Sequence, residues 1–509
     1  MRYDHRGPDR LRTFRPWPGI ARSVATGLAL VSLASMAACG EGGDASNETA
    51  GAESGASTSI AEREAAATRY PLKEAFFGET HVHTGVSMDA FIGGNRLTPD
   101  GAYRFAKGEE VMANGQMHRI KRPLDFAAVT DHSEFMGEAY SLMTPGAPGY
   151  DDEVARSFRE AEDLETALGL YNQYVLTPLA GGGDPHPPFF QGEEAIATTW
   201  RNNWEATENH YEPGTFTTIH AYEWTAAPDG ANQHRNVLFR DNDVPRIPFS
   251  SNESLDVIDL WAWMQVQRSE GRRVFAMPHN SNESKGLTFG EATLSGEPYT
   301  EEYAQTRASM EPLIEMMQVK GNSEVVPDFW QADEFADFEN ARSLQDYNGR
   351  VYQKENFVRY GLDRGLKYKE DLGTNPFKYG FVGGTDNHNG TPSNVAEDNY
   401  MVGSHGLTDV APEARANNVL DGEMLIADTN PGAITGVWAE SNTRGDIWDA
   451  MAAKETFATS GPRIRVRAFA GQGFESSYDS YESMVEAGYG NGVPMGSDYT
   501  GTGAPQILV

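Results

Sequence analysis

Residues 74–85 have the sequence EAFFGETHVHTG, and this stretch decides the fold class that the sequence predicts. An apolar, aromatic run of strand type leads directly into the pair His81-x-His83. Residues two apart in a strand point to one face of a sheet, so both imidazoles should lie together. The stretch therefore predicts a strand that ends in two metal-binding side chains.

Six further short apolar runs follow the same plan, with β-branched and aromatic residues inside and Gly, Pro, Asn or Asp at their ends. They are residues 124–132 (LDFAAVTDH), 216–225 (FTTIHAYEWT), 234–240 (HRNVLFR), 272–280 (RRVFAMPHN), 313–321 (LIEMMQVKG) and 378–388 (KYGFVGGTDNH). Segments with helical spacing separate them, which predicts a mainly parallel sheet, open or closed into a barrel. The polar clusters lie at the C-terminal ends of nearly all runs, where barrel active sites are built.

Imidazole and carboxylate side chains gather at these strand ends. The six histidines are His81, His83, His132, His234, His279 and His388. The carboxylates beside them are Asp89, Asp131, Glu223 and Asp386. Together they form the ligand set of zinc, manganese and iron sites, so we expect a multi-metal hydrolase. His220 is out of register with Glu223 and should point away from this site.

The segment 135–214 interrupts this pattern. It contains two stretches with helical patterning, joined by the Gly/Pro-rich loop LAGGGDPHPPFFQGE. We expect a helical insertion after the second strand, acting either as a lid that selects the substrate or as a peripheral decoration.

The N-terminal segment resembles an export signal. Residues 1–38 combine a basic start with an apolar run that is too short for a membrane span, which needs about 20 apolar residues. The run ends at Cys39, as in a bacterial lipobox, and Cys39 is the single cysteine of the chain, so no internal disulfide can form. We expect a signal peptide over 1–38, a lipid on Cys39 and a flexible tether over 39–70. The mature protein would then be lipid-anchored in the periplasm or on the cell surface of a bacterium.

The chain is strongly acidic, with a formal net charge of −33 at pH 7. Such a surface repels nucleic acid, so no nucleic-acid partner is expected. An anionic substrate would also be repelled at long range, and metal ions in the cleft would have to outweigh that repulsion.

The motifs resemble those of the PHP (polymerase and histidinol phosphatase) superfamily, and specifically an uncharacterised branch of exported PHP-like proteins. Four motifs occur in the order of that superfamily: His81-x-His83, Thr130-Asp131-His132, the isolated His279, and Asp386-x-His388. The resemblance implies a distorted seven-stranded β/α barrel over 71–440, with the helical insertion at 135–214 and a trinuclear metal site.

The resemblance also implies ligand roles. One ion would be held by His81, His83 and the bridging Glu223 and Asp386. A second would be held by Glu223, His234 and His279, and a third by Asp89, His132 and His388. Asp131 would bind metal, orient His132 or assist proton transfer.

Two to three divalent ions (Zn, Mn or Fe) in such a site would supply hydroxide and clamp a phosphoryl oxygen. The sequence therefore predicts hydrolysis of a small anionic phosphoester, with Asp131 and Glu223 as catalytic residues. Three cations beyond the strand ends are candidates for substrate binding: Arg235, Lys285 and Lys320.

Two alternatives stay open at this point. An amidohydrolase-type barrel that cleaves amides or lactones also begins with His-x-His, and Lys320 would have to carry its bridging carbamate. A non-catalytic lipoprotein that captures metal or ligand is the other. Residues 441–509 end on a strand-like run, which predicts a C-terminal region that is incomplete.

Overall fold

The computed structural model describes residues 59–180, 183–344, 352–393, 395–396, 399–400, 412–417, 419–420 and 424–509. The predicted signal peptide, Cys39 and most of the predicted tether lie outside these ranges. Within them, no helix combines the length and apolar character needed to cross a membrane. Helix α1 (Ile60–Ala66) occupies the end of the predicted tether, and Ser59 and Glu62 form a capping box at its start.

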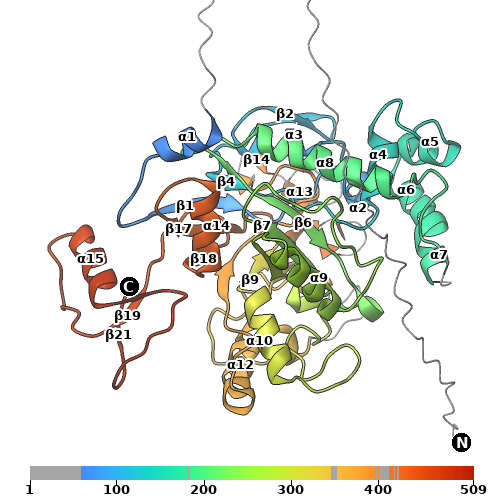
Figure 1. The fold of residues 1–509 in the computed structure, drawn as a ribbon. Coiled ribbons are helices and arrows are strands. Elements are labelled where there is room, and N and C mark those ends of the chain that lie inside the picture. Colours follow the sequence, from blue (N-terminus) through green and yellow to red (C-terminus); the bar gives the residue numbers. More distant parts are fainter. Residues whose placement is uncertain are drawn as a thin grey trace, which may run out of the picture. The chain divides into compact units, whose positions relative to one another are not determined.

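The first motif follows strand β1 of a five-stranded mixed sheet. The order of this sheet is β18-β17-β1-β4-β5, and Figure 1 labels four of these strands, β1, β4, β17 and β18. The strands are β1 (Glu74–Glu79), β4 (Phe126–Ala127), β5 (Thr217–Thr218), β17 (Ile434–Ala439) and β18 (Thr456–Thr459). β1, β4 and β5 are parallel, whereas β17 runs antiparallel to both β1 and β18. Residues 75–79 of β1 are all buried, as expected for a strand covered on both faces.

A second sheet of order β6-β7-β8 is entirely antiparallel, which corrects the expectation of a mainly parallel fold. Its strands are β6 (His220–Trp224), β7 (Arg235–Phe239) and β8 (Val274–Pro278), and every residue in them is buried. Only residues 225–234 separate β6 from β7, which is too short for the crossover that parallel strands need.

Isolated bridges link these sheets near the motifs. His132, just after β4, forms a parallel bridge with Glu223 of β6. Val82, between the two histidines of the first motif, forms one with Asn387, beyond the parallel pair β9 (Leu313–Glu315) and β12 (Gly380–Val382). The fold is thus mixed α/β with several small sheets, and closure into a seven-stranded barrel stays a prediction.

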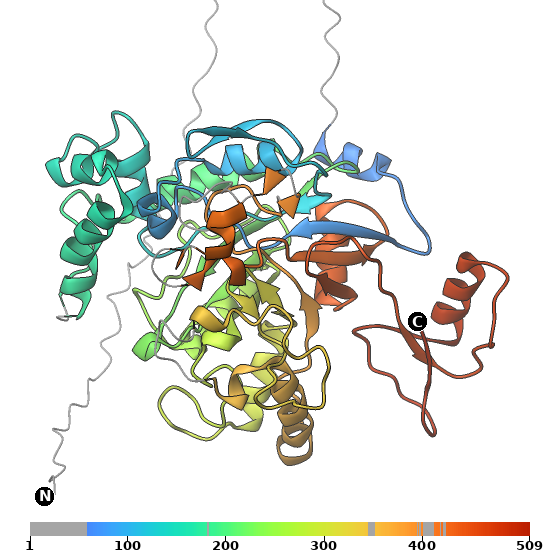
Figure 2. The same ribbon diagram turned by 180° about the vertical axis from the view of Figure 1, so that it is seen from behind.

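The described elements between β4 and β5 are all helical. They are α4 (Met136–Met143), α5 (Glu153–Glu160), α6 (Leu164–Tyr171), the π-helical turn η1 (Asn172–Leu176), α7 (Thr177–Ala180) and α8 (Glu193–Asn209). Figures 1 and 2 show α5, α6 and α7 grouped together in both views. The apolar side of α2 (Met88–Ile92) packs into this group, where Phe91 joins a cluster with Leu142, Phe158 and Phe189.

The remaining elements surround these sheets. The helices are α3 (Pro99–Ala106), α9 (Val257–Ser269), α10 (Glu301–Met310), α12 (Val358–Leu372), α13 (Pro412–Asn417), α14 (Arg444–Ala452) and α15 (Tyr481–Asn491). The 3-10 turns are η2 (Pro228–Gly230), η3 (Ser281–Glu283), η4 (Lys354–Asn356) and η5 (Ile426–Asp428). The short strand pairs are β2 (Val111–Ala113) with β3 (Gln116–His118), β10 (Met317–Gln318) with β11 (Gly321–Asn322), β13 (Val395–Ala396) with β14 (Asn399–Tyr400), and β15 (Val419–Leu420) with β16 (Met424–Leu425).

The C-terminal residues divide into two parts. α14 and β18 belong with the five-stranded sheet, beyond the boundary at residue 440 that the sequence predicts. The last part is a small antiparallel sheet of β19 (Phe469–Gly471), β20 (Gly492–Pro494) and β21 (Gln506–Leu508), with α15 against it.

A pair formed by the buried His220 and the partly buried Glu208 joins the insertion to the sheets. Nε2 of His220 lies 2.8 Å from Oε1 of Glu208, and Nη1 of Arg444 donates to the same carboxylate at 2.7 Å. Burial lowers the pKa of His220 to about 4. Burial would raise the pKa of Glu208, but the hydrogen bond with His220 and the charge of Arg444 lower it to about 2.

We expect this pair to make the fold sensitive to acid. Both pKa values are lower in the folded chain than in the unfolded one, so the unfolded chain binds more protons in this range. The stabilisation from His220 is complete above about pH 6.5 and is lost as the pH falls toward 4; that from Glu208 is lost between about pH 4.5 and 2. The free energy of unfolding should therefore decrease from pH 7 to pH 4, and His220→Phe should flatten this decrease. An unchanged slope in that variant would contradict the assignment.

Candidate metal centre

Three groups of side chains at the ends of the strands could each hold a metal ion. The groups are His81, His83, Glu223 and Asp386; Glu223, His234 and His279; and His83, His132 and His388. Within each group the offered ligand atoms all lie within 4.8 Å of one another. The sequence-predicted ligands thus converge, although they are spread over some 300 residues of chain.

Glu223, the penultimate residue of β6, is shared by two of these groups. Its Oε1 lies 3.0 Å from Nδ1 of His234 and 3.1 Å from Nε2 of His279. Its Oε2 lies 3.3 Å from Nε2 of His81 and 3.1 Å from Nε2 of His83. The two oxygens therefore face different histidine pairs, as a bridging carboxylate requires.

Asp386 completes the group around His81 and His83. Its Oδ1 lies 3.2 Å from Nε2 of His81 and 3.1 Å from Nε2 of His83. The backbone of Asp386 adopts a left-handed conformation (φ +52°), which non-glycine residues occupy rarely and aspartate more readily than most. This local conformation places the carboxylate against both histidines, four residues after the end of β12.

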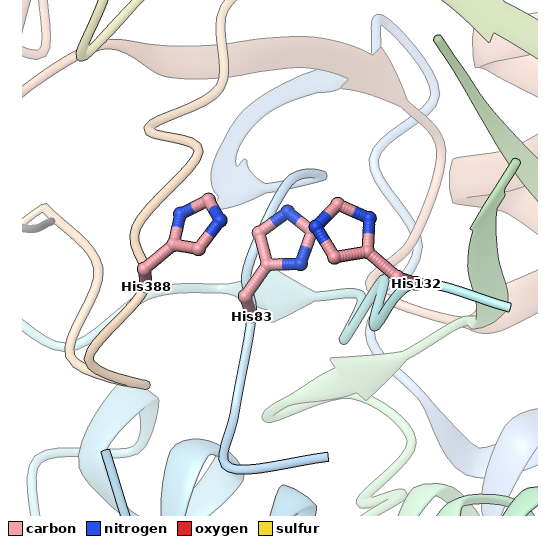
Figure 3. Close-up of side chains that lie close together, drawn as sticks. All are labelled: His83, His132 and His388. Atoms are coloured by element: carbon pink, nitrogen blue, oxygen red, sulfur yellow. The ribbon is translucent and has the colours of Figure 1, made fainter. Parts of the chain in front are cut away.

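Figure 3 shows the three histidines of the third group side by side. The ring of His83 lies 4.4 Å from that of His132 and 4.2 Å from that of His388, between ring centroids. Oδ2 of Asp89 lies 3.2 Å from Nε2 of His132 and 3.1 Å from Nε2 of His388. Asp89, on α2, thus contacts the two histidines with which the resemblance grouped it.

The residues present fit divalent metal ions. Nε2 of His83 is fully buried and has no hydrogen-bond partner among the described residues, yet it faces two carboxylate oxygens. Burial lowers the pKa of His279 to about 3 and that of His388 to about 4, so both rings are neutral, the form that binds metal. Burial would raise the pKa of Glu223, but the histidines around it, His132 and His279 foremost, hold it well below its usual range.

The outer nitrogens of the histidines contact a supporting layer that sequence reasoning missed. Nδ1 of His81 lies 3.0 Å from Oε2 of Glu315, and both side chains are fully buried. Nδ1 of His132 lies 2.6 Å from the hydroxyl of Thr225. The sequence contains one sign that Glu315 is part of the site. A carboxylate inside the apolar run 313–319 is expected to be buried, and a buried carboxylate needs a polar partner.

Asp131 also belongs to this supporting layer. It accepts hydrogen bonds from the amide and hydroxyl of Thr84 and from the hydroxyl of Ser87, each at 2.7 Å. Ser87 in turn lies 2.9 Å from Nδ1 of His83. Asp131 is not a member of the three ligand groups, and it reaches His83 through Ser87. Ser87 also accepts a hydrogen bond at 3.1 Å from the backbone amide of His132, the histidine that Asp131 is expected to orient.

We expect Glu315→Gln to weaken metal binding about 10–100-fold, the usual cost of losing a carboxylate that orients a metal-binding histidine. The carboxylate keeps the proton of His81 on Nδ1, which leaves the Nε2 lone pair for the metal. The measurement is metal affinity by competition with a chelator. Glu79→Gln is the matched control, because Glu79 is also buried beside His81 but accepts hydrogen bonds from the backbone amides of Thr80, His81 and Thr385. The control should lower Tm more than affinity, and wild-type affinity in Glu315→Gln would contradict the role.

The three predicted substrate-binding cations lie in different surroundings. Nζ of Lys320 contacts Oδ2 of Asp386, and its side chain is 24% exposed, so it lies at the open side of the centre together with Asp89, which is 37% exposed. Lys285 is exposed, and its Nζ donates to the backbone oxygen of Asp229. Arg235 is buried and donates to Glu311, so its guanidinium lies in the core. Lys320 thus contacts a carboxylate of the metal centre, whereas the contact of Arg235 with a metal-ligand candidate is to the backbone oxygen of His234, 3.5 Å from its Nη1.

Comparisons with known proteins give a family. One solved structure with some likeness is a two-domain protein from Bacteroides vulgatus ATCC 8482 that contains a predicted PHP-like metal-dependent phosphoesterase. It shares 12% identity with this chain at a TM-score of 0.29, over 77% of this chain and 67% of its own. No curated protein matches the chain. A family model described as "Protein of unknown function (DUF3604)" matches residues 70–509, and the chain therefore belongs to that family.

Proposed function

We propose that this protein is a multi-metal-dependent hydrolase of phosphoesters with a PHP-like barrel. The observation that supports the proposal most is the sharing of Glu223 by two buried ligand groups, with His83 shared between the first and third. Shared ligands place ions close enough to act on one substrate group. Clustered divalent ions, when bound, generate hydroxide near neutral pH and neutralise charge on a phosphoryl group.

Side chains of the protein would bind and orient the substrate. Lys320 carries a positive charge at the open side, because the nearby Asp386 raises its pKa against the opposing effect of burial. It would hold an anionic oxygen of the substrate beside Asp386. Asp89 and His132 are partly exposed and would lie at the rim of the same opening. Water would enter through this opening, and the leaving alcohol would leave through it.

The amidohydrolase-type alternative requires a lysine that bridges two metals as a carbamate. Lys320 contacts Asp386 instead, and the carboxylate that faces two histidine pairs is Glu223. These contacts favour the phosphoester proposal. The contacts do not distinguish an enzyme from the non-catalytic alternative, and a measurement of hydrolytic activity is needed for that.

The test is a comparison of chelated protein with samples restored by Zn, Mn or Fe. Aryl phosphates, phosphodiesters, amides and lactones would be assayed in parallel. Metal-restored hydrolysis of a phosphoester is the expected result. Turnover of amides or lactones with all phosphoesters ignored would replace the proposal by the amidohydrolase-type alternative, and inactivity of fully loaded protein on the whole panel would favour a binding protein.

We also propose that the protein is exported and anchored through lipid on Cys39. The support is the short apolar run that ends at the single cysteine. Cys39→Ser should move the protein from the membrane fraction to the soluble fraction of a bacterial host. Unchanged membrane attachment of that variant would refute the anchor.

A further inference from the structure

A buried carboxylate lies where the helical insertion begins. Glu134 is 7% exposed and directly precedes Phe135, whose left-handed backbone (φ +59°) turns the chain into α4. Glu134 belongs to none of the three ligand groups. In the described part of the chain, every donor to its two oxygens is neutral: two backbone amides and two hydroxyls. Burial of a carboxylate without a cation is costly, and the hydrogen bonds that compensate for it fix the groups around it.

The hydrogen bonds of Glu134 extend the backbone pairing between two segments of the metal centre. The amide of Glu223 donates to the carbonyl of Asp131, and the amide of Ser133 donates to the carbonyl of Glu223. In a parallel ladder the amide of Thr225 would be the next donor to the first segment. It donates to Oε2 of Glu134 at 3.2 Å, so a side chain takes the place of a backbone acceptor. The pairing therefore reaches one residue beyond β6, although the first segment turns away there.

Glu134, Thr225 and Ser251 form a closed ring of hydrogen bonds. The amide of Ser251 donates to Oε1 of Glu134, and the hydroxyl of Ser251 donates to the carbonyl of Thr225 at 3.0 Å. The amide of Thr225 completes the ring through Oε2 of Glu134. Thr225 is thus held at both its amide and its carbonyl, which restricts where its hydroxyl can lie.

This hydroxyl contacts a candidate metal ligand. Oγ1 of Thr225 lies 2.6 Å from Nδ1 of His132, a member of the third ligand group. A hydroxyl that accepts the Nδ1 proton fixes the tautomer of the ring and leaves Nε2 for a metal ion. Nε2 of His132 lies 3.2 Å from Oδ2 of Asp89. Two contacts therefore connect Glu134 with the metal centre, Glu134 to Thr225 and Thr225 to His132.

We propose that Glu134 is a positioning residue of the metal centre, which holds Thr225 so that its hydroxyl orients His132 toward a metal ion. Glu134 also ties the start of the insertion to the loop that contains Ser250 and Ser251. This anchor lies between His132 and the insertion in the chain, so it keeps the histidine in place when the insertion moves. The inference rests on the metal centre of the proposed function but not on its chemistry with phosphoesters.

The test is a double-mutant cycle on the full-length protein, with Zn²⁺ affinity measured by competition with a chelator. Glu134→Gln leaves one acceptor oxygen for two amides, so the ring opens. We expect the affinity for one Zn²⁺ per chain to fall about 10–100-fold, the usual cost of losing a group that orients a metal-binding histidine. Thr225→Val removes the hydroxyl and should cost as much. In the Thr225→Val protein, Glu134→Gln should lower the affinity less than about twofold further, because the path to His132 is already cut.

Glu253→Gln is the matched control, because exposed Glu253 accepts the amide of Ser250 at 3.0 Å and steadies the same loop from outside the ring. It should keep the wild-type affinity. If Glu134→Gln does not fold, Ser251→Ala opens the ring at the carbonyl of Thr225 and takes its place in the cycle.

Three results would overturn the inference: wild-type affinity in the ring-opening variant, an equal loss in Glu253→Gln, or fully additive losses in the cycle. A wild-type chain that binds no Zn²⁺ would overturn it together with the proposed function. The expected losses in a protein that binds Zn²⁺ but ignores every phosphoester would support the role of Glu134 and refute the phosphoesterase proposal alone.

Discussion

Glu223→Gln should reduce the bound metal of the reconstituted protein to less than half of the wild-type value and abolish hydrolysis. Both oxygens of Glu223 face ligand candidates, with His234 and His279 on one side and His81 and His83 on the other. An amide keeps the shape but offers one oxygen and no charge, so it bridges two cations poorly. The measurement is elemental analysis after restoration with Zn, Mn or Fe, followed by activity.

A matched control for this variant is Glu138→Gln. Glu138 is a fully buried carboxylate in α4 that pairs with His186 and belongs to none of the three ligand groups. Its variant should retain the wild-type metal content. Full metal loading of Glu223→Gln, or equal loss in both variants, would mean that Glu223 is not the bridge.

Gly384→Ala should have the second-largest effect, because the site has no room for a methyl group there. A Cβ on Gly384 would lie 2.3 Å from Oε2 of Glu315 and 2.7 Å from Cβ of His81. Both neighbours are buried, so the added carbon would push the histidine from its position or separate the strands. We expect a loss of about 1–3 kcal/mol in the free energy of unfolding, the usual cost of overpacking, together with weaker metal binding.

The control for crowding is Gly169→Ala in α6. A Cβ at Gly169 would meet no atom within 4 Å, and alanine favours helix over glycine by about 0.5–1 kcal/mol. The Tm of Gly384→Ala should therefore fall below that of the wild-type protein, and the Tm of Gly169→Ala should rise above it. An equal Tm for Gly384→Ala and the wild-type chain would show that the close approach of Gly384 to His81 is not required.

The sequence predicted the ligand candidates because metal-binding residues at strand ends follow a short-range pattern. His81 and His83 are two apart and both reach the centre, as alternation along an extended segment requires. The same alternation explains why Asp131 is not a member of the three ligand groups and why the guanidinium of Arg235 lies in the core. Asp131 and Arg235 each adjoin a ligand candidate in sequence, His132 and His234, and an adjacent residue in extended chain points to the opposite side.

Other features depend on contacts that no local pattern encodes. Glu315 is 234 residues from the histidine that it orients, and Thr225 is 93 residues from His132. The antiparallel pairing of β7 with β8 also escaped prediction, because a helix between two strands usually indicates a parallel crossover.

Asp89, which contacts His132 and His388 of the third ligand group, is held by a different part of the fold from the other carboxylates of the centre. Asp89 lies on α2, and the apolar side of α2 packs against the insertion helices rather than against either large sheet. Glu223, in contrast, lies in strand β6, and Asp386 lies four residues after strand β12. Substitutions in the insertion should therefore move Asp89 while Glu223 and Asp386 keep their positions. Metal affinity that depends on Asp89 would then follow the stability of the insertion, whereas affinity that depends on Glu223 and Asp386 would follow the stability of the sheets.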